Sequence, residues 1–224
     1  MEAKWLQPED VLARGLIIRM ASTELDAAPS TAFRWRHRFL QLAQPVKAPA
    51  LTGVVEAEAD KTFFLRSSKG QRPGRTPRKR GGRASRKNRG EDLIPVLVAR
   101  DRSGATADFL LAAVSKVCLS EVLKPRVNAD AILCPDGSAA MAATAKELGV
   151  HHEAMNLSAG ERVRGPRHIQ NVNAYHGRLK GLKGGMHRFK GVATSYLKSY
   201  LGWFCAIDRA RRSRNQGPPM LLRP

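Results

Sequence analysis

The residues best suited to chemistry are acidic side chains on two stretches with strand-like patterns. Residues 51–65 alternate in the manner of a half-buried strand. On that strand Glu56, Glu58 and Asp60 share one face, where burying three carboxylates is costly unless a cation meets them. Asp136 follows a second, short apolar stretch. Because Mg²⁺ prefers oxygen ligands, the pattern predicts a divalent-metal site if the two strands are neighbours in one sheet.

Two metal ions in such a site would suit phosphodiester chemistry. A pair of ions about 3.5–4 Å apart can activate a water or a 3′-hydroxyl and stabilise the leaving oxygen. Alternation does not decide which acid of the first strand is the ligand, so Glu56 and Glu58 remain alternatives to Asp60. The Asp136-Gly137 pair could equally be an ordinary turn after a strand.

The elements that would position these acids alternate between strand and helix. Strand patterns occur at residues 94–100, 105–111, 131–134 and 150–157, and helical patterns at 112–124, 138–148 and 169–210. A hairpin, a helix, a strand that ends in an acid, a further strand and a closing helix is the order of an RNase H-like α/β domain. We therefore expect a mixed sheet flanked by helices over residues 51–210.

A small helical segment is expected before this domain, at residues 1–48. A break at Asp26–Pro29 separates a helical stretch from a further helix over residues 31–43, which suggests a helix-turn-helix whose last helix enters the major groove of DNA. A solvated three-helix cap is the alternative. The helix has an apolar side of Ala32, Trp35, Phe39 and Leu42 and a polar side of Arg34, His37, Arg38 and Gln41, and the first three polar residues are candidate DNA contacts.

The charge of the chain indicates a polyanionic partner. The sequence has 39 Lys and Arg against 19 Asp and Glu, a net charge of +20, which a solvated surface does not require. DNA is the expected partner. No long apolar run favours a membrane, and the N-terminus has no apolar signal segment. Three widely spaced cysteines form no zinc or disulfide pattern, so we expect a cytoplasmic, nucleoid-associated protein.

The densest basic segment is residues 66–92, with eleven Lys and Arg and frequent Gly and Pro. This composition predicts a flexible loop. A solvated run of charge is the ordinary alternative, but the density of one sign favours contact with DNA phosphates and a strong dependence on salt. A basic tail is expected at residues 211–224. The candidate DNA contacts in the loop are Arg78, Lys79, Arg80, Arg83, Arg86, Lys87 and Arg89.

Several runs resemble insertion-sequence transposases of the ISXO-like family. They are IPVLVARDRSGAT (94–106), DAILCPDG (130–137), HEAMNLSAGERVRG (152–165), HIQNVNAYHGRLKG (168–181) and GVATSYLKSYLGW (191–203). The run STAFRWRHRFL (30–40) is similar to the helix-turn-helix that precedes the catalytic domain in that family. The resemblance extends from about residue 5 to residue 209.

This resemblance implies a site and a reaction. The family signature is Asp, Asp, then Asn or Glu, with a Lys seven residues later, which implies catalytic roles for Asp60, Asp136, Asn173 and Lys180. The first three would hold two Mg²⁺ or Mn²⁺ ions. Seven residues are two helical turns, so Asn173 and Lys180 share a helix face, where Gly177 would leave room for a backbone phosphate.

The implied function is metal-dependent cleavage of DNA and strand transfer at the ends of an insertion sequence. The implied partners are the terminal inverted repeats and the target DNA. A homodimer or larger assembly is expected, because two transposon ends must be held together.

The chain departs from the family pattern in three ways. Relatives begin with a zinc ribbon of two Cys pairs, which this sequence lacks, so we expect a ribbon that was lost or is encoded in another frame. The strand has VVEAEADKT where the family has VVEADET, as if two residues were duplicated. An insertion of two preserves which face each side chain occupies, but about 7 Å of strand must be absorbed. Finally, Lys61 replaces a family Glu.

These departures leave two other hypotheses open. One is a catalytically decayed transposase that acts only as a DNA-binding protein. The other is a ribonuclease H or Holliday-junction nuclease with the same fold, against which the helix-turn-helix pattern argues.

Overall fold

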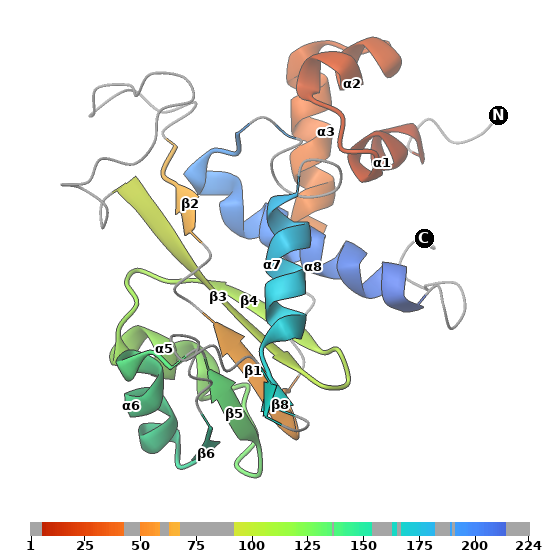
Figure 1. Cartoon of the computed structure of the whole chain (residues 1–224). Helices are drawn as coiled ribbons and strands as arrows, with labels where there is room; N and C mark the ends of the chain where they lie inside the picture. Colours follow the sequence, from red (N-terminus) through yellow and green to blue (C-terminus); the bar gives the residue numbers. More distant parts are fainter. Residues whose placement is uncertain are drawn as a thin grey trace. The chain divides into compact units, whose positions relative to one another are not determined.

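The computed structural model describes residues 6–42, 50–58, 63–67, 92–135, 137–153, 163–164, 167–181, 189 and 191–213. The chain divides into two compact units, one formed by Met1–Lys47 with Gly177–Pro224 and the other by Ala48–His176. This division differs from the expected boundaries, because the N-terminal helices share a unit with the C-terminal helix (Figure 1). Asp60, Asp136, Lys61 and the candidate DNA contacts of the basic loop lie outside the described residues.

The unit of residues 48–176 is built on a mixed sheet, as the sequence predicts (Figure 1). Its strands run in the order β2-β3-β1-β5-β6, and β4 also pairs with β3. Pairings of β3 with β1, β2 and β4 are antiparallel, whereas β1 with β5 and β5 with β6 are parallel. The strands are β1 (Val54–Glu58), β2 (Phe63–Leu65), β3 (Leu93–Asp101), β4 (Thr106–Leu110), β5 (Ile132–Pro135) and β6 (His151–His152). A separate antiparallel pair is formed by β7 (Val163–Arg164) and β8 (Arg167–His168).

The single strand expected at residues 51–65 is observed as β1 and β2, which pair with successive parts of β3. Glu58 is paired with Val98, and Phe63 is paired with Pro95. Glu58 and Phe63 are therefore five residues apart in the sequence (63 − 58), whereas their partners on β3 are three residues apart (98 − 95). The two surplus residues agree in number with the duplication inferred from the sequence. Because two is an even number, strand alternation keeps Phe64 on the same sheet face as Glu56.

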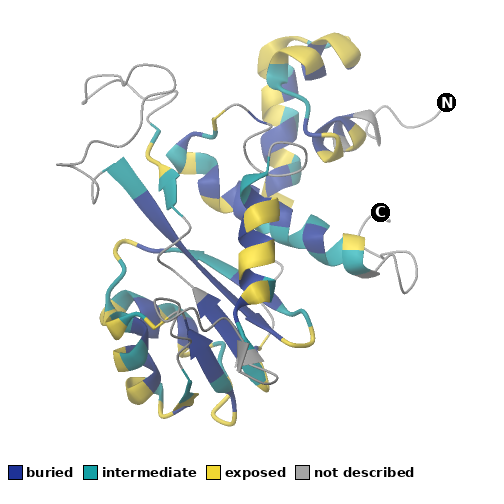
Figure 2. Cartoon of the chain, viewed as in Figure 1, coloured by how far each residue is buried: buried dark blue, intermediate teal, exposed yellow. Residues whose placement is uncertain are grey.

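One face of this sheet is covered by α5 (Lys116–Leu123) and α6 (Ala139–Leu148). Alternate strand residues, among them Val55, Leu97 and Leu133, join these helices in one buried core, and β1, β3 and β5 are largely dark in Figure 2. Residues at both ends of α6 cap the helix: the Ser138 hydroxyl accepts a hydrogen bond from the Met141 amide, and Gly149 has a φ of 68°.

A third helix, α7 (Gln170–Lys180), begins on the opposite face of the sheet. The long helical segment expected at residues 169–210 is divided, because α8 (Leu197–Ser213) begins only after a short 3₁₀ turn at Thr194–Tyr196. Gly191 has a φ of 96°, which an α-helix does not admit. Among the described residues, no helix is long and apolar enough to cross a bilayer.

The other unit contains α1 (Leu6–Ala13), α2 (Ile18–Glu24), α3 (Pro29–Leu42) and α8. A short connection joins α2 to α3, and Asp26 within it has a φ of 45°, a conformation that Asp tolerates better than most residues. Pro29 occupies the first position of α3, where its missing N–H costs nothing.

The apolar side expected for α3 was partly wrong. Its buried residues are Ala32, Arg36, His37 and Leu40, whereas Leu42 is 72% exposed. The reason is that α3 has two packing partners. Ala32 and Trp35 face the core of α1 and α2, and the His37 ring lies against Tyr196 beside α8.

Candidate active site

The strands that lead to the two candidate aspartates are direct neighbours. Parallel pairing sets Glu56 beside Cys134 and Ala57 beside Pro135. Asp136 follows Pro135 directly in the sequence, and Asp60 follows the end of β1 by two residues. Parallel neighbouring strands end at the same edge of a sheet. A shared metal site requires the two acid-bearing strands to be neighbours in one sheet, and β1 and β5 are neighbours.

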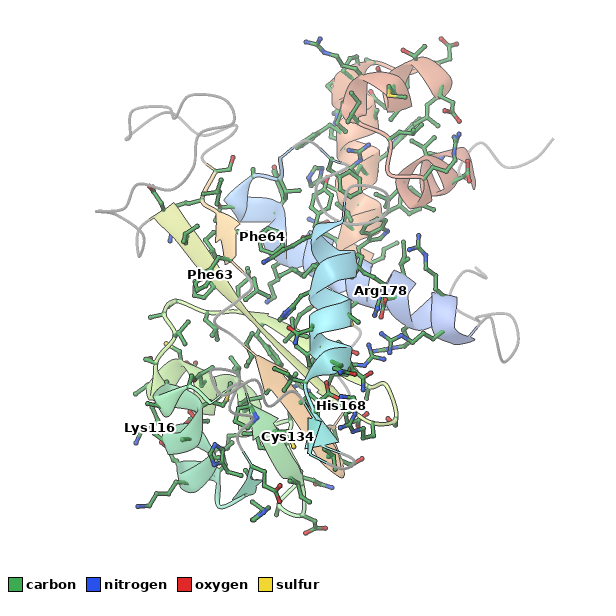
Figure 3. All side chains as sticks on the ribbon, in the orientation of Figure 1. Phe63, Phe64, Lys116, Cys134, His168 and Arg178 are labelled. Carbon is green, nitrogen blue, oxygen red and sulfur yellow. The ribbon has the colours of Figure 1, made fainter. Side chains whose placement is uncertain are left out.

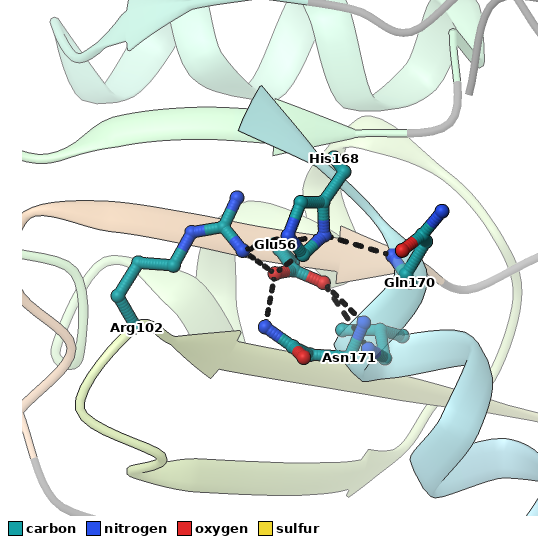
Figure 4. A network of polar contacts seen from close by, with 6 residues as sticks. Glu56, Arg102, His168, Gln170 and Asn171 are labelled. Atoms are coloured by element: carbon teal, nitrogen blue, oxygen red, sulfur yellow. Dashed lines mark hydrogen bonds and ion pairs between the residues drawn. The ribbon is translucent and has the colours of Figure 1, made fainter. Parts of the chain in front are cut away.

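Glu56 is a buried carboxylate on β1, with no exposed surface. It faces the first turn of α7, as the close view in Figure 4 shows. Its Oε2 accepts hydrogen bonds from the backbone amides of Asn171 at 3.0 Å and Val172 at 3.2 Å. Its Oε1 accepts one from the Asn171 side-chain amide at 2.8 Å.

Two cationic or polar side chains complete this network. Arg102 Nη1 lies 2.8 Å from Glu56 Oε1, and His168 Nδ1 lies 3.5 Å from the same oxygen. A carboxylate offers about four lone-pair positions, and these neighbours occupy them. In this arrangement the Glu56 carboxylate is directed at α7, Arg102 and His168.

His168, labelled in Figure 3, links Arg102 to the start of α7 (Figure 4). Arg102 Nη1 lies 2.7 Å from His168 Nε2, and the Gln170 amide lies 3.3 Å from His168 Nδ1. A neutral imidazole has one accepting nitrogen, so one of the two contacts is a hydrogen bond at any time. When Nδ1 accepts, the ring holds the amide of Gln170, the first residue of α7, and when Nε2 accepts, it holds Arg102.

Helix α7 carries Asn173 and Lys180, as expected from the sequence. Val172, Tyr175 and Leu179 are fully buried, whereas Asn173 is exposed and Lys180 is half-buried. Gly177 lies on the exposed side, and a Cβ added there would meet no atom within 4 Å. Among the described residues, none packs against Gly177 on the exposed side of α7.

A second carboxylate, that of the half-buried Asp108 on β4, contacts the same helix. The Tyr175 hydroxyl donates a hydrogen bond of 2.6 Å to Asp108 Oδ2. Burial raises the pKa of Asp108, and the hydrogen bond from Tyr175 opposes that rise. Sequence reasoning identified neither Asp108 nor Glu56 as an anchor. An acid in an otherwise apolar strand was the available signal, and both carboxylates contact α7.

No cluster of three His, Cys, Asp or Glu side chains able to hold a metal occurs among the described residues. The two aspartates expected in that role are not among them. Asn173 is the one proposed ligand whose place in an element is described.

The candidate DNA contacts on α3 differ in exposure. Arg34 and Arg38 are exposed. His37 is buried, with its Nδ1 2.8 Å from the Phe33 carbonyl oxygen and its ring centroid 4.0 Å from that of Tyr196. Burial lowers the pKa of His37, the Phe33 hydrogen bond opposes this, and the neighbouring Arg36 lowers it further. His37 therefore packs inside its unit, unlike Arg34 and Arg38 on the exposed side of α3.

Comparison with known families decides what kind of domain this is. The model of the ISXO2-like transposase domain matches residues 50–204. The chain belongs to the ISXO2-like transposase family. Every residue of α7, β1 and β5 falls inside the matched transposase domain. The match begins after α3, so it does not extend to the segment of α1 to α3.

Other comparisons add little to this assignment. Among curated proteins, no relative matches the transposase chain. Among solved structures, it is similar to a chain of the crystal structure of a pre-cleavage Mos1 transpososome. The similarity covers 92% of this chain and 78% of that one, with 12% sequence identity and a TM-score of 0.28, too low to support an argument about the site.

Proposed function

We propose that this chain catalyses DNA cleavage and strand transfer at the ends of an insertion sequence. The observation that carries the proposal is the parallel pairing of β1 with β5 inside a transposase domain. Acids that follow two such strands can share a site at one edge of the sheet. Asp60 and Asp136 are the proposed metal ligands, with Asn173 as a third, neutral one.

The donor chemistry fits hard divalent cations. Carboxylate and amide oxygens are ligands of Mg²⁺ and Mn²⁺. Two such ions, when bound, would activate the attacking oxygen and stabilise the leaving one. In this proposal Asn173 orients the reacting strand from an exposed position on α7, and Lys180, two turns further on, binds a DNA phosphate as a point charge.

The proposed DNA contacts outside the catalytic residues are basic side chains. Arg34 and Arg38 lie four residues apart on the exposed side of α3, as a recognition helix would require. The basic residues between Arg78 and Arg89 would contact phosphates, so binding would weaken steeply with salt. The proposed partners are the terminal repeats and target DNA, held by a dimer or larger assembly.

Strand transfer with purified protein tests the proposal. End-sequence DNA is incubated with Mg²⁺ or Mn²⁺, and wild type is compared with Asp136→Ala and Glu147→Gln. Glu147 is an exposed residue of α6 that pairs with Lys116, so Glu147→Gln is expected to match wild type. Asp136→Ala is expected to abolish joined product. Equal product from Asp136→Ala and wild type would end the assignment.

A second function is favoured by one observation, the two-residue offset between β1 and β2. The offset falls beside Asp60, and a displaced ligand would leave a protein that binds DNA ends without cutting them. That protein would bind terminal repeats with the same salt dependence but yield no cleavage at any metal concentration.

A further inference from the structure

We propose that Glu56 is a positioning residue for the transposase reaction, because it fixes the start of α7 on the sheet and thereby sets the orientation of Asn173. The inference rests on the proposed function for its catalytic consequence. Its structural part stands on contacts of described residues alone.

Glu56 satisfies amides that a helix leaves without partners. The first four N–H groups of an α-helix have no carbonyl to bind within the helix. Asn171 and Val172 are the second and third residues of α7, and both of their amides donate to Glu56 Oε2. A capping side chain normally comes from the residue before the helix. Here the acceptor comes from a strand more than a hundred residues earlier in the chain.

The charge of Glu56 strengthens this attachment. A carboxylate at a helix N-terminus is favoured by the helix dipole, and hydrogen bonds to an ionised acceptor are stronger than neutral ones. Arg102, with 29% of its side chain exposed, pairs with the same carboxylate from the opposite side. These partners compensate the buried charge of Glu56. Removing one of them would leave part of that charge without a partner in the interior, which is strongly destabilising.

The attachment lies directly beside the proposed catalytic amide. Asn173 is the next residue after Val172, and its own amide donates to the Ile169 carbonyl at 3.0 Å within the same turn. The hydrogen bond from Tyr175 to Asp108 fixes the helix again two residues after Asn173. With contacts on both sides of Asn173, α7 can neither rotate about its axis nor slide along the sheet without breaking one of them.

The Glu56→Gln variant tests whether the Glu56 carboxylate positions α7 or whether the side chain only fills space. Glu56→Gln keeps the size of the side chain but replaces one acceptor oxygen with an NH₂ group. That group would face the Asn171 and Val172 amides or the Arg102 guanidinium, all of which are donors. The variant should therefore loosen the first turn of α7 while leaving the core of the opposite face unchanged.

The experiment measures three quantities on Glu56→Gln, with Glu147→Gln as the matched control. They are amide hydrogen exchange at residues 170–174 relative to β3, the Kd for end DNA, and the strand-transfer rate at saturating Mn²⁺. We expect faster exchange at the start of α7, an unchanged Kd, and a strand-transfer rate lower by about 100-fold, the effect of misplacing a reacting group by about 1 Å. Glu147→Gln should match wild type in all three.

The outcomes separate this inference from the proposed function. Unchanged exchange in Glu56→Gln overturns the anchoring role. Unchanged strand transfer in Glu56→Gln, in a series where Asp136→Ala is inactive, overturns the positioning role and leaves the proposed function standing. Full activity of Asp136→Ala overturns the proposed function, while the exchange measurement still decides whether Glu56 holds α7.

A second variant covers the case in which Glu56→Gln does not fold. Asn171→Ala removes only the side-chain donor to Glu56 and leaves both backbone contacts in place. Asn171→Ala should show faster exchange at the start of α7 and slower strand transfer, each to a smaller extent than Glu56→Gln. Wild-type exchange and wild-type strand transfer in Asn171→Ala would then overturn the inference.

Discussion

Glu58 and Phe63 lie five residues apart in the chain, yet the β3 residues with which they pair lie only three apart. Strands in register along a common partner advance one residue for one residue. The two surplus residues are therefore accommodated between Glu58 and Phe63, in the segment that contains Asp60.

Removing Glu58 and Ala59 together should restore the register. The shortened strand would read VVEADKT and keep each side chain on its face. If Asp60 is the ligand, the strand-transfer rate should rise by roughly tenfold, equivalent to 1.4 kcal/mol in the barrier. The rate is measured at fixed Mn²⁺ concentration.

Removal of Ala59 alone is the matched control for that deletion. A deletion of one residue inverts the faces of the following strand, so this variant should be inactive and less stable. A lower rate after the double deletion would instead identify Glu58 as the strand-borne ligand.

Gly177→Ala tests whether α7 approaches DNA closely. A Cβ at position 177 meets no protein atom within 4 Å, and Ala favours an interior helical position by roughly 0.5–1 kcal/mol. The variant should therefore raise the thermal midpoint, yet weaken end-DNA binding if the phosphate backbone lies against this position. Tighter binding together with higher stability would argue that DNA does not contact Gly177.

The raised pKa of the half-buried Asp108 predicts a pH dependence of stability. Its pKa is raised in the folded state from a usual value of 3.8, so the folded protein retains a proton that the unfolded chain releases. Its stabilising contribution is complete below that usual value and is lost as pH rises through the raised pKa. In Asp108→Asn the side chain can still accept the Tyr175 hydrogen bond, and the free energy of unfolding should decrease less as the pH rises. Urea unfolding between pH 4 and neutrality, at about one-unit steps, measures it.

His37 predicts the opposite slope in the unit of α1 to α3 and α8. Its pKa is lowered below 6.5 by burial, so protonation favours the unfolded chain. The stabilising contribution of the neutral ring is complete above pH 6.5 and is lost as pH falls through the lowered pKa. His37→Phe should remove this dependence, measured by thermal unfolding. A wild-type slope in His37→Phe would contradict the assignment to His37.

Local sequence signals predicted the elements well where the pattern and the packing agree. The hairpin of β3 and β4 and the helix α6 are of this kind. Alternation also placed Glu56 on one face of its strand. It could not identify what would lie over that face, because the partner begins at residue 170.

The error in the predicted apolar side of α3 has the same physical origin, a packing partner that is distant in the sequence. The apolar side of α3 was misplaced because α8, more than 150 residues later, buries Arg36 and His37. Arg36 is held by the Leu16 carbonyl and by the ring of Phe189, 5.3 Å from its guanidinium carbon. A sequence pattern records the polarity of these side chains but not the contacts that compensate it.

The saturation of the Glu56 carboxylate limits how this transposase can evolve. Every lone pair of that side chain is committed to α7, Arg102 or His168, so it has no spare capacity to replace a damaged neighbour. If Asp60 is the metal ligand, a copy that loses it could draw on only one other acid of the same strand, Glu58. The site thus has little redundancy, and inherited errors in this short strand should inactivate an element faster than errors in the basic regions, where many cations share one task.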